Sequence, residues 1–483
     1  MRFAERVREH PAVAGGGHAA PEPGSRSRAT FGGVVVTLCL IYLMLRPVGS
    51  NEVLIPVLGV LGLTAAGLAM AHRRRVSPLL VPCIALFAMV VALGSVVGID
   101  NPGWAYALIT WVAGPVAFGL WAVALRAPLL RLTMLAAAWA TIALSAFIVL
   151  YVGAQAGILP SVIPPVLLEE SGAGFDGTGP ATVIRLYGLS TLAAAAPMWT
   201  ASLLVGAHPW LPGVALRLAA GASAIAAVML GGRRAIILTV LLTPLIVAAL
   251  RMLTATGRRA RVPRWVAVTG ILAVPAAAIL APRVLEQAAV QRALRALADF
   301  FSPDQGAVGV AVRTDQSRIL LDEAAQRPLF GHGFGAVLES GYARNLERPW
   351  EFELQYHLLA FQVGALGIVL LCIAACCAVA ALRRAALLDP SAAPVLIVTA
   401  TGAIAMLVAN ASNPYLQAPG HMWAIALALG AVNTVLVSGD GQRHDAALRP
   451  TGSAGSADSA GSLPRAAGSS DAAAGGVGDA AAP

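Results

Sequence analysis

Long runs of apolar residues alternate with short polar segments along most of the 483-residue chain. The hydrocarbon core of a bilayer is about 30 Å thick and takes about 20 residues of α-helix to cross. Twelve runs come close to this length or exceed it, at 31–48, 53–71, 78–98, 103–125, 130–152, 186–207, 213–231, 235–250, 265–281, 357–381, 393–410 and 421–438. The pattern predicts an all-α, polytopic integral membrane protein with about twelve transmembrane helices.

The polar segments differ in length and divide the chain into five parts. The longest precedes the tenth predicted helix, and the last is rich in Gly, Ala, Ser and Asp, a composition typical of disorder. We expect an N-terminal tail at 1–30, helices one to nine at 31–281, a large loop at 282–356, helices ten to twelve at 357–438 and a disordered tail at 439–483.

The large loop has a pattern of its own. Residues 283–301 place most apolar side chains along one helical face, which indicates a helix that lies on the membrane surface. A second helix is expected over 314–326, and Pro328 ends it. Residues 331–335 (GHGFG) then indicate a flexible turn.

The composition agrees with a membrane protein: 58% of the residues are hydrophobic, 12% are charged and the mean hydropathy is +0.76. The net charge is +9, every basic residue is Arg, and most of this charge lies in short loops between predicted helices. Such charge orients a membrane protein in the bilayer, so we expect no nucleic-acid partner.

Arginine placement predicts the orientation. Cytoplasmic loops carry an excess of basic residues, and alternate loops here, together with five Arg in the N-terminal tail, carry that excess. We therefore expect both termini in the cytoplasm and the 282–356 loop outside it. The loop arginines are Arg73, Arg74, Arg75, Arg126, Arg131, Arg217, Arg251, Arg258, Arg259, Arg261, Arg264, Arg383 and Arg384.

Two arginines break this rule. Arg233 and Arg234 lie in a very short turn between the seventh and eighth predicted helices, on the predicted outer face. Charged residues at a membrane boundary usually serve a function. The alternative is that these side chains extend to lipid phosphates or pair with acidic residues of the loop.

The end of the large loop gathers groups that accept protons. Glu351 and Glu353 precede the tenth predicted helix, and His357 follows one helical turn after Glu353, so we expect Glu353 and His357 on one helical face. Pairing of Glu353 with Arg348 is the alternative. We also expect His332, between two glycines, to be exposed and able to touch a phosphate or a sugar.

Four stretches of the chain resemble motifs of the O-antigen ligase and polymerase family of membrane glycosyltransferases. Gly232-Arg233-Arg234-Ala235 is similar to the Gly-Ser-Arg-Gly-Ala that opens a helix in the family, with Arg234 at the position of the functional arginine. Arg318 followed by 327–335 (RPLFGHGFG) is similar to its Arg…Pro-Leu-x-Gly-x-Gly-x-Gly stretch.

The other two stretches are 353–367 (ELQYHLLAFQVGALG), which resembles a polar catalytic residue before an apolar run into Gly-x-x-Gly, and 185–188 (RLYG), which resembles an Arg-x-x-Gly before a span. The likeness covers roughly residues 180–380. Family ligases carry His-Asn where this chain has Glu353-Leu354, and the usual Asn-Pro after Arg-x-x-Gly is missing. Both departures favour a polymerase over a lipopolysaccharide ligase.

The resemblance implies an enzyme of a bacterial plasma membrane whose large outer loop is catalytic. Its donor is an oligosaccharide on a polyprenyl diphosphate, and its acceptor is a sugar hydroxyl of another glycan, attacked with inversion at the anomeric carbon. It implies polymerisation of surface polysaccharide repeat units, with other polysaccharide assembly proteins as further partners beside the bilayer. No metal-ligand cluster or nucleotide-binding motif occurs, so we expect no metal and no cofactor.

Roles follow for eight residues. Guanidinium groups bind phosphate oxygens in pairs and stay charged, and a carboxylate takes the acceptor's proton. The expected catalytic residues are Glu353, Arg234 and Arg318; the expected substrate-binding residues are Arg185, Arg233, His332, Glu351 and His357.

Three alternatives stay open from the sequence. A ligase would transfer the glycan to a lipid or protein acceptor. A lipid-glycan transporter or flippase would use arginine for the diphosphate as well, but would carry ionisable residues near the middle of the membrane. A scaffold within an assembly complex would leave the outer arginine pair unexplained.

Overall fold

A computed structural model describes residues 23–47, 51–176, 183–255, 307–343 and 346–447. The chain divides into two compact units, Met1–Gly439 and Asp440–Pro483, and in the second only the end of one helix is described. Most of both predicted tails, the ninth predicted span at 265–281 and the surface helix at 283–301 lie outside the described residues.

Apart from one small hairpin, the regular secondary structure of the described residues is helical. The two three-residue strands β1 (Gly174–Asp176) and β2 (Val183–Arg185) pair antiparallel, with Gly174 opposite Arg185, an element that the all-α prediction omitted. The helices are α1 (Pro23–Leu45), α2 (Asn51–Ala71), α3 (Val81–Val97), α4 (Trp104–Leu108), the π-helix η1 (Ile109–Ala113), α5 (Gly114–Ala124), α6 (Ala127–Gln155), α7 (Pro165–Glu170), η3 (Tyr187–Thr191), α8 (Leu192–Leu204), α9 (Val214–Gly231), α10 (Arg234–Thr254), α13 (Ala307–Ala324), α14 (Gln355–Leu388), η4 (Pro390–Ala392), α15 (Ala393–Ala409), η5 (Tyr415–Gln417), η6 (Pro419–Met422) and α16 (Trp423–Ala447).

Each predicted span within the described residues overlaps helical structure, although 103–125 is divided among α4, η1 and α5 and 186–207 between η3 and α8. The helices α1, α14 and α16 extend well beyond the predicted ends. Within the described residues, eight helices are long and apolar enough to cross a membrane, by length and composition. The apolar helices Thr30–Leu45 and Val81–Val97 are shorter, and α8 has only 13 residues. The predicted count of twelve spans therefore stays a prediction.

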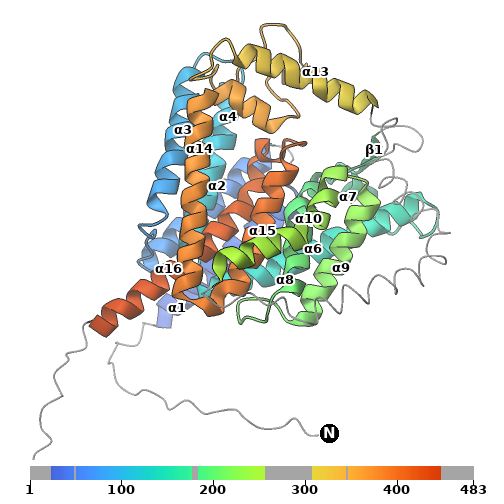
Figure 1. Ribbon diagram of the computed structural model, residues 1–483. Coiled ribbons are helices and arrows are strands. Elements are labelled where there is room, and N and C mark those ends of the chain that lie inside the picture. The colour runs from blue at the N-terminus through green and yellow to red at the C-terminus, as the bar shows by residue number, and fades with distance from the viewer. Residues whose placement is uncertain (1–22, 48–50, 177–182, 256–306, 344–345, 448–483) are drawn as a thin grey trace, which may run out of the picture. The chain divides into compact units, whose positions relative to one another are not determined.

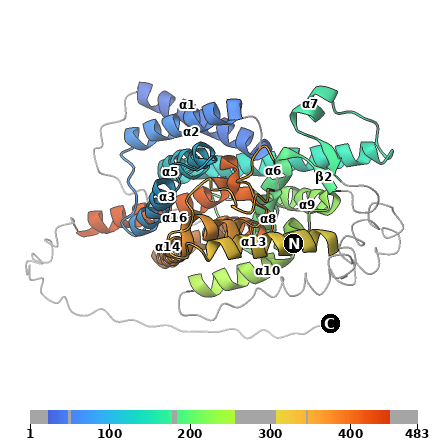
Figure 2. The same ribbon diagram turned by 90° about the horizontal axis from the view of Figure 1, so that it is seen from above.

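Small side chains let the helices approach closely around α8. Ala193, Ala194, Ala195 and Ala196 are fully buried, and α8 packs against α15, α9 and α10. Small residues at helix contacts bring backbones together, which is the main source of packing energy between helices in lipid. Seen from above, α1 and α2 lie along one edge, α10 along the opposite edge and α8 between them (Figure 2).

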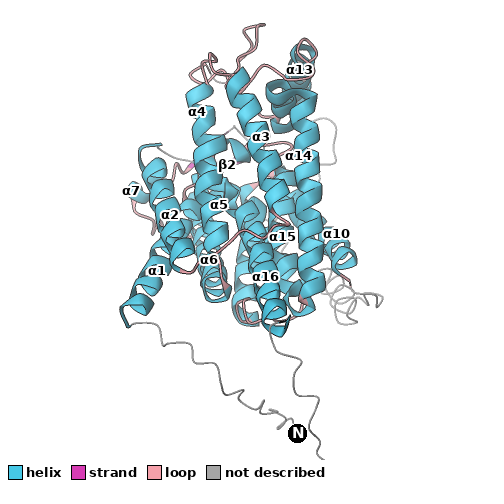
Figure 3. Cartoon of the chain, turned by 90° about the vertical axis from the view of Figure 1, so that its left-hand side faces the viewer, coloured by secondary structure: helices cyan, strands magenta, loops and turns pink. Residues whose placement is uncertain are grey.

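The second helix predicted in the large loop is present as α13, which begins earlier than expected. It lies at the end of the bundle that also carries α4 and the first turn of α14 (Figures 1 and 3). We call this end, together with the turn at 410–421 that contacts it, the α13 end. It is the end at which the sequence placed the outer face.

The glycine-rich segment 331–335 is not the flexible turn that the sequence predicted. Gly331, Gly333 and Gly335 have φ of +70°, +85° and +73° and are buried. A Cβ added at Gly333 would lie 2.3 Å from the Cα of Gly98, and one at Gly335 would lie 2.2 Å from the carbonyl carbon of Gly103. The segment is a tightly packed strap, because its glycines let the backbone touch α3 and α4.

A break in α14 completes this packing. Gly364 has non-helical angles within α14 (φ 61°, ψ −171°). The amide donors of Ala365 and Leu366 bond the carbonyls of Pro328 and Leu329, and the carbonyls of Phe361 and Gln362 accept from His332 and Gly333. Backbone groups freed by a break in an apolar helix must be satisfied inside the protein. The glycine strap at 331–335 and the Gly364-x-x-Gly367 segment of α14 thus interlock through backbone hydrogen bonds.

Candidate active site

The arginine pair begins α10. Gly232 ends α9 in the left-handed conformation (φ +63°), Arg233 is the N-cap of α10 and Arg234 is its first residue. The guanidinium of Arg233 donates to the carbonyl oxygen of Ile184 over 3.4 Å, whereas Arg234 is exposed. The positive end of the helix dipole adds to both charges, so an anion is favoured here.

Arg185 belongs to the same neighbourhood. It is exposed at the end of β2, directly after the Ile184 carbonyl that Arg233 binds. Its charge also acts on the phenol of Tyr151 in α6. The structure therefore places Arg185 directly after the residue whose carbonyl oxygen Arg233 binds.

The short helical turn η5, which was not predicted from the sequence, lies within electrostatic range of the cationic region formed by Arg185, Arg233 and Arg234. Arg233 acts electrostatically on Tyr415 in η5, and the ring of Tyr415 lies 5.8 Å from that of His421. The buried His421 in turn bonds the hydroxyl of Ser190 in η3 through Nε2. Burial raises the pKa of the Tyr415 phenol to about 12, although the charge of Arg233 opposes the shift. The phenol therefore keeps its proton near neutral pH and can donate it to an anion.

The same turn also contacts the segment that contains Glu351 and Glu353, which we call the carboxylate region. The side-chain amide of Gln417 donates to the carbonyl of Phe352 over 3.0 Å. The backbone carbonyl of Gln417 accepts from Tyr106 Oη over 3.4 Å and from Thr110 Oγ1 over 3.1 Å. Tyr415 and Gln417, two residues apart, thus link the arginines of α10 to the segment before α14.

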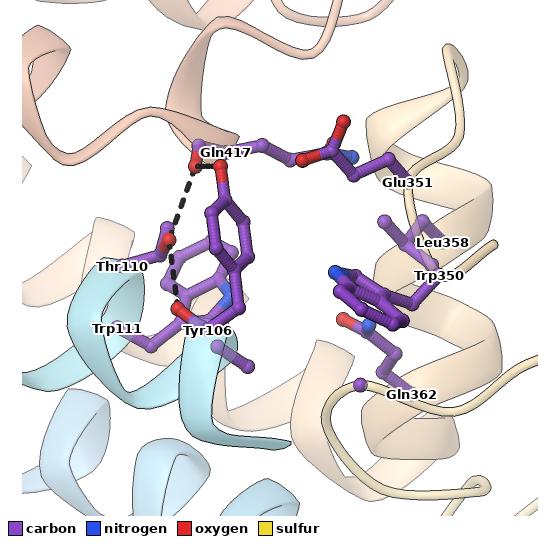
Figure 4. A pocket seen from close by; sticks show the side chains of 10 residues that line it. Tyr106, Thr110, Trp111, Trp350, Glu351, Leu358, Gln362 and Gln417 are labelled. Atoms are coloured by element: carbon purple, nitrogen blue, oxygen red, sulfur yellow. Dashed lines mark hydrogen bonds between the residues drawn. The ribbon is translucent and has the colours of Figure 1, made fainter. Parts of the chain in front are cut away.

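Glu351 borders a small cavity. Its carboxylate pairs with Arg348 over 3.1 Å, and the Arg348 guanidinium lies 5.3 Å from the ring centroid of Tyr106. Tyr106, Trp350 and Gln362 line the cavity together with Glu351 (Figure 4). A carboxylate, a phenol and an indole therefore meet at one point of the α13 end.

Glu353 occupies a different environment from the one predicted. It lies before the start of α14, so it does not share a helical face with His357, and that expectation is wrong. Its carboxylate pairs with Arg313 of α13 over 3.0 Å, and its backbone amide donates to Gln316 Oε1 over 3.0 Å. The suggested pairing with Arg348 is also wrong, because Arg348 pairs with Glu351. The half-buried His357 lies in the first turn of α14.

Arg318 is exposed on α13. Residues 313, 316 and 320 of α13 turn toward the segment before α14, and at 100° per residue position 318 lies on the other side of the helix. Gln316 and Leu320 are buried accordingly. The structure therefore does not bring Arg318 together with Glu353, although both belong to the same end of the bundle.

His332 is buried, contrary to the prediction that it is exposed. Its Nε2 lies 2.9 Å from the backbone carbonyl of Glu323, and its ring stacks on Phe361 at a centroid distance of 4.6 Å. The carboxylate of Glu323 accepts from the amides of Glu339 and Ser340 over 3.0 and 3.1 Å. These contacts hold α13 on the glycine strap, so His332 has a structural position.

Four residues of this site were not predicted from the sequence: Tyr106, Tyr415, Gln417 and His421. A usable signal was present for the last three, because the predicted outer turn at 411–420 and its two flanks hold Asn410, Ser412, Asn413, Gln417 and His421 within twelve residues. Such polar density between two apolar helices is unusual. Tyr106 carried no signal, because only the folded position of α4 brings it to Glu351.

Among the described residues, no group of three or more His, Cys, Asp or Glu side chains is placed to hold a metal ion. No family model matches the chain, and no curated protein has significant sequence similarity to it. The likeness to the O-antigen ligase and polymerase family therefore depends on the four sequence stretches alone.

Proposed function

We propose that this protein is a membrane glycosyltransferase that moves an oligosaccharide from a polyprenyl diphosphate to a sugar hydroxyl and so polymerises repeat units of a surface polysaccharide. The observation that carries the proposal is the link made by η5. The charge of Arg233 acts on Tyr415, and the side chain of Gln417 bonds the segment that contains Glu351 and Glu353. Cations for a leaving group and carboxylates for an incoming group thus occupy one end of an apolar helix bundle.

The cationic region suits a lipid diphosphate. Arg234 is exposed at the start of a helix, with Arg233 and Arg185 beside it. A guanidinium forms charge-assisted hydrogen bonds with phosphate oxygens worth about 1.5–3 kcal/mol each. These bonds strengthen as the bond from the anomeric carbon to the diphosphate oxygen breaks and its electron pair moves to that oxygen, so they accelerate departure.

The carboxylate region suits the acceptor. The acceptor oxygen forms a new bond to the anomeric carbon as its proton passes to a carboxylate, which contributes about 10²–10⁴-fold to such reactions. Glu353 is the base expected from the sequence, and Glu351 borders the cavity. Each carboxylate is held in place by an ion pair with an arginine.

The buried charges favour transfer over transport. Among the described residues, the buried Arg217 lies in the first turn of α9 and bonds the carbonyl of Ser202, while the buried Glu323 belongs to α13. Neither lies in the middle of a candidate span. A flippase for a diphosphate would need polar groups along a path through the bilayer.

The test is glycan length in cells that lack the native gene. They are complemented with the wild type, Arg234→Ala, Glu351→Gln or Glu353→Gln at equal membrane levels. Long chains with the wild type and single repeat units with Arg234→Ala and at least one carboxylate variant are expected. Polymer that stays on its lipid carrier in cells without the gene would indicate a ligase, and full-length glycan with every variant would refute the proposal.

A further inference from the structure

The cavity beside Glu351 contains two buried polar atoms without a partner among the described residues. The indole nitrogen of Trp350 is a donor and the side-chain oxygen of Gln362 is an acceptor, and neither forms a hydrogen bond. Gln362 is only 4% exposed. Leaving a buried polar group unpaired costs about 1–3 kcal/mol, so a site that retains two of them in one cavity is built for an occupant.

The two side chains line the same cavity. Figure 4 shows Trp350 and Gln362 together on the α14 side of the cavity, with Tyr106 facing them and the Glu351 carboxylate at its edge. The interlocked backbone fixes Gln362, because its carbonyl accepts from Gly333. Gln417 fixes the opposite wall through its bonds to Tyr106 and Thr110.

The size of the cavity decides which group fits. Its volume is about 20 Å³, and a site needs about 10–15 Å³ to hold one water molecule. A single hydroxyl group fits, whereas a sugar ring does not. A hydroxyl also has the right chemistry, since it can accept a bond from the Trp350 N–H while it donates one to the Gln362 oxygen.

We propose that this cavity is the acceptor subsite, in which one hydroxyl of the incoming sugar is held between Trp350 and Gln362 next to Glu351. The inference rests on the proposed function and sharpens it, because it makes Glu351 the nearer base. The sugar ring then lies at the cavity mouth against Trp350 and Tyr106, where aromatic faces suit the apolar face of a sugar.

The test uses the full chain in lipid nanodiscs and a defined probe. The probe is the repeat-unit oligosaccharide released by mild acid from lipid carriers of cells that lack the gene, labelled with a fluorophore at its reducing end. Its binding is measured by fluorescence anisotropy, which needs no turnover. Transfer from the intact lipid-linked oligosaccharide to the same probe is measured separately.

Two variants remove the proposed contacts and one serves as a matched control. Gln362→Met keeps side-chain length and removes the amide, and Trp350→Phe keeps an aromatic ring and removes the N–H. Gln355→Met is the control: Gln355 is also on α14, is fully buried and has an unpaired amide, but does not line the cavity. Each lost hydrogen bond is expected to weaken probe binding about tenfold, with the control within about twofold.

The outcomes separate the two proposals. Weaker probe binding by Gln362→Met and Trp350→Phe, but not by Gln355→Met, supports the subsite. Equal binding by all four proteins overturns it and leaves the cavity to a structural water, whether or not transfer occurs. Absence of probe binding to the wild type also overturns it. Selective binding without any transfer by the wild type would keep a sugar site and refute the proposed function.

Discussion

The cationic and carboxylate regions of the α13 end are built in opposite ways. Within the described residues, Arg233 and Arg234 form no ion pair, and Arg234 is exposed. Glu351 and Glu353 instead each have a counterion of their own, and the adjacent backbone is locked by the glycine strap. Among the described residues, Arg233 and Arg234 thus have no carboxylate partner, whereas the cavity beside Glu351 lacks only a small neutral group to bond Trp350 and Gln362. This difference teaches that the two regions receive chemically different parts of a reaction.

The difference between the two regions predicts the largest loss of transfer rate at the carboxylates. If the cavity holds the acceptor, Glu351→Gln should lower the transfer rate by about 10²–10⁴-fold, the usual contribution of a general base. Glu353→Gln should lower it by about tenfold or less, because Glu353 is held by Arg313 away from the cavity. Single-turnover transfer rates in nanodiscs measure both. The reverse order would return the role of base to Glu353.

The cationic region should show the next largest effect. Arg234→Ala removes charge-assisted bonds worth about 1.5–3 kcal/mol each, so transfer should fall about 10²-fold, and Arg234→Lys should recover part of it. Arg131→Ala is the matched control, an exposed arginine in the first turns of α6. Affinity for the lipid-linked donor and the transfer rate are measured for all three variants. An equal loss in the Arg131 variant would show a general membrane effect instead.

Rigidity of the carboxylate region can be tested through its glycines. Gly333→Ala forces a Cβ to within 2.3 Å of the Gly98 backbone at a φ of +85°, so we expect a loss of about 3 kcal/mol or more in stability. Gly341→Ala has a similar φ of +71° but nothing within 4 Å, and should cost about 1 kcal/mol. Thermal unfolding in detergent compares the two. Equal melting temperatures would mean that the strap is loosely packed.

The smallest effect is expected at Tyr415, where the two regions meet. Tyr415→Phe should slow transfer about tenfold, the value of one hydrogen bond to an anion. Because burial raises the pKa of the phenol to about 12, this contribution should persist between pH 7 and 10, whereas an unperturbed phenol is half ionised near pH 10. The ratio of wild-type to Tyr415→Phe rates across this range is the measurement. A ratio that collapses below pH 10 would contradict a buried donor.

Much of the candidate site was accessible from local patterns. The positions of the helices, of α13 and of the arginine pair at a helix start followed from hydrophobic runs and from a charge that broke the positive-inside bias. The exposure of His332 and the helical pairing of Glu353 with His357 were predicted wrongly, because burial and the exact helix start depend on distant segments.

The sequence by itself determined the local features of the protein: an apolar helical chain, its breaks and the charges at their edges. All of these depend on interactions within a few residues. What only the tertiary structure decided is which groups meet. The break at Gly364 is satisfied by residues 328–333, the turn at 415–417 joins α10 to the segment before α14, and Tyr106 reaches Glu351 from more than two hundred residues away. Such contacts depend on backbone groups that must find partners away from water, and no local pattern specifies the partner.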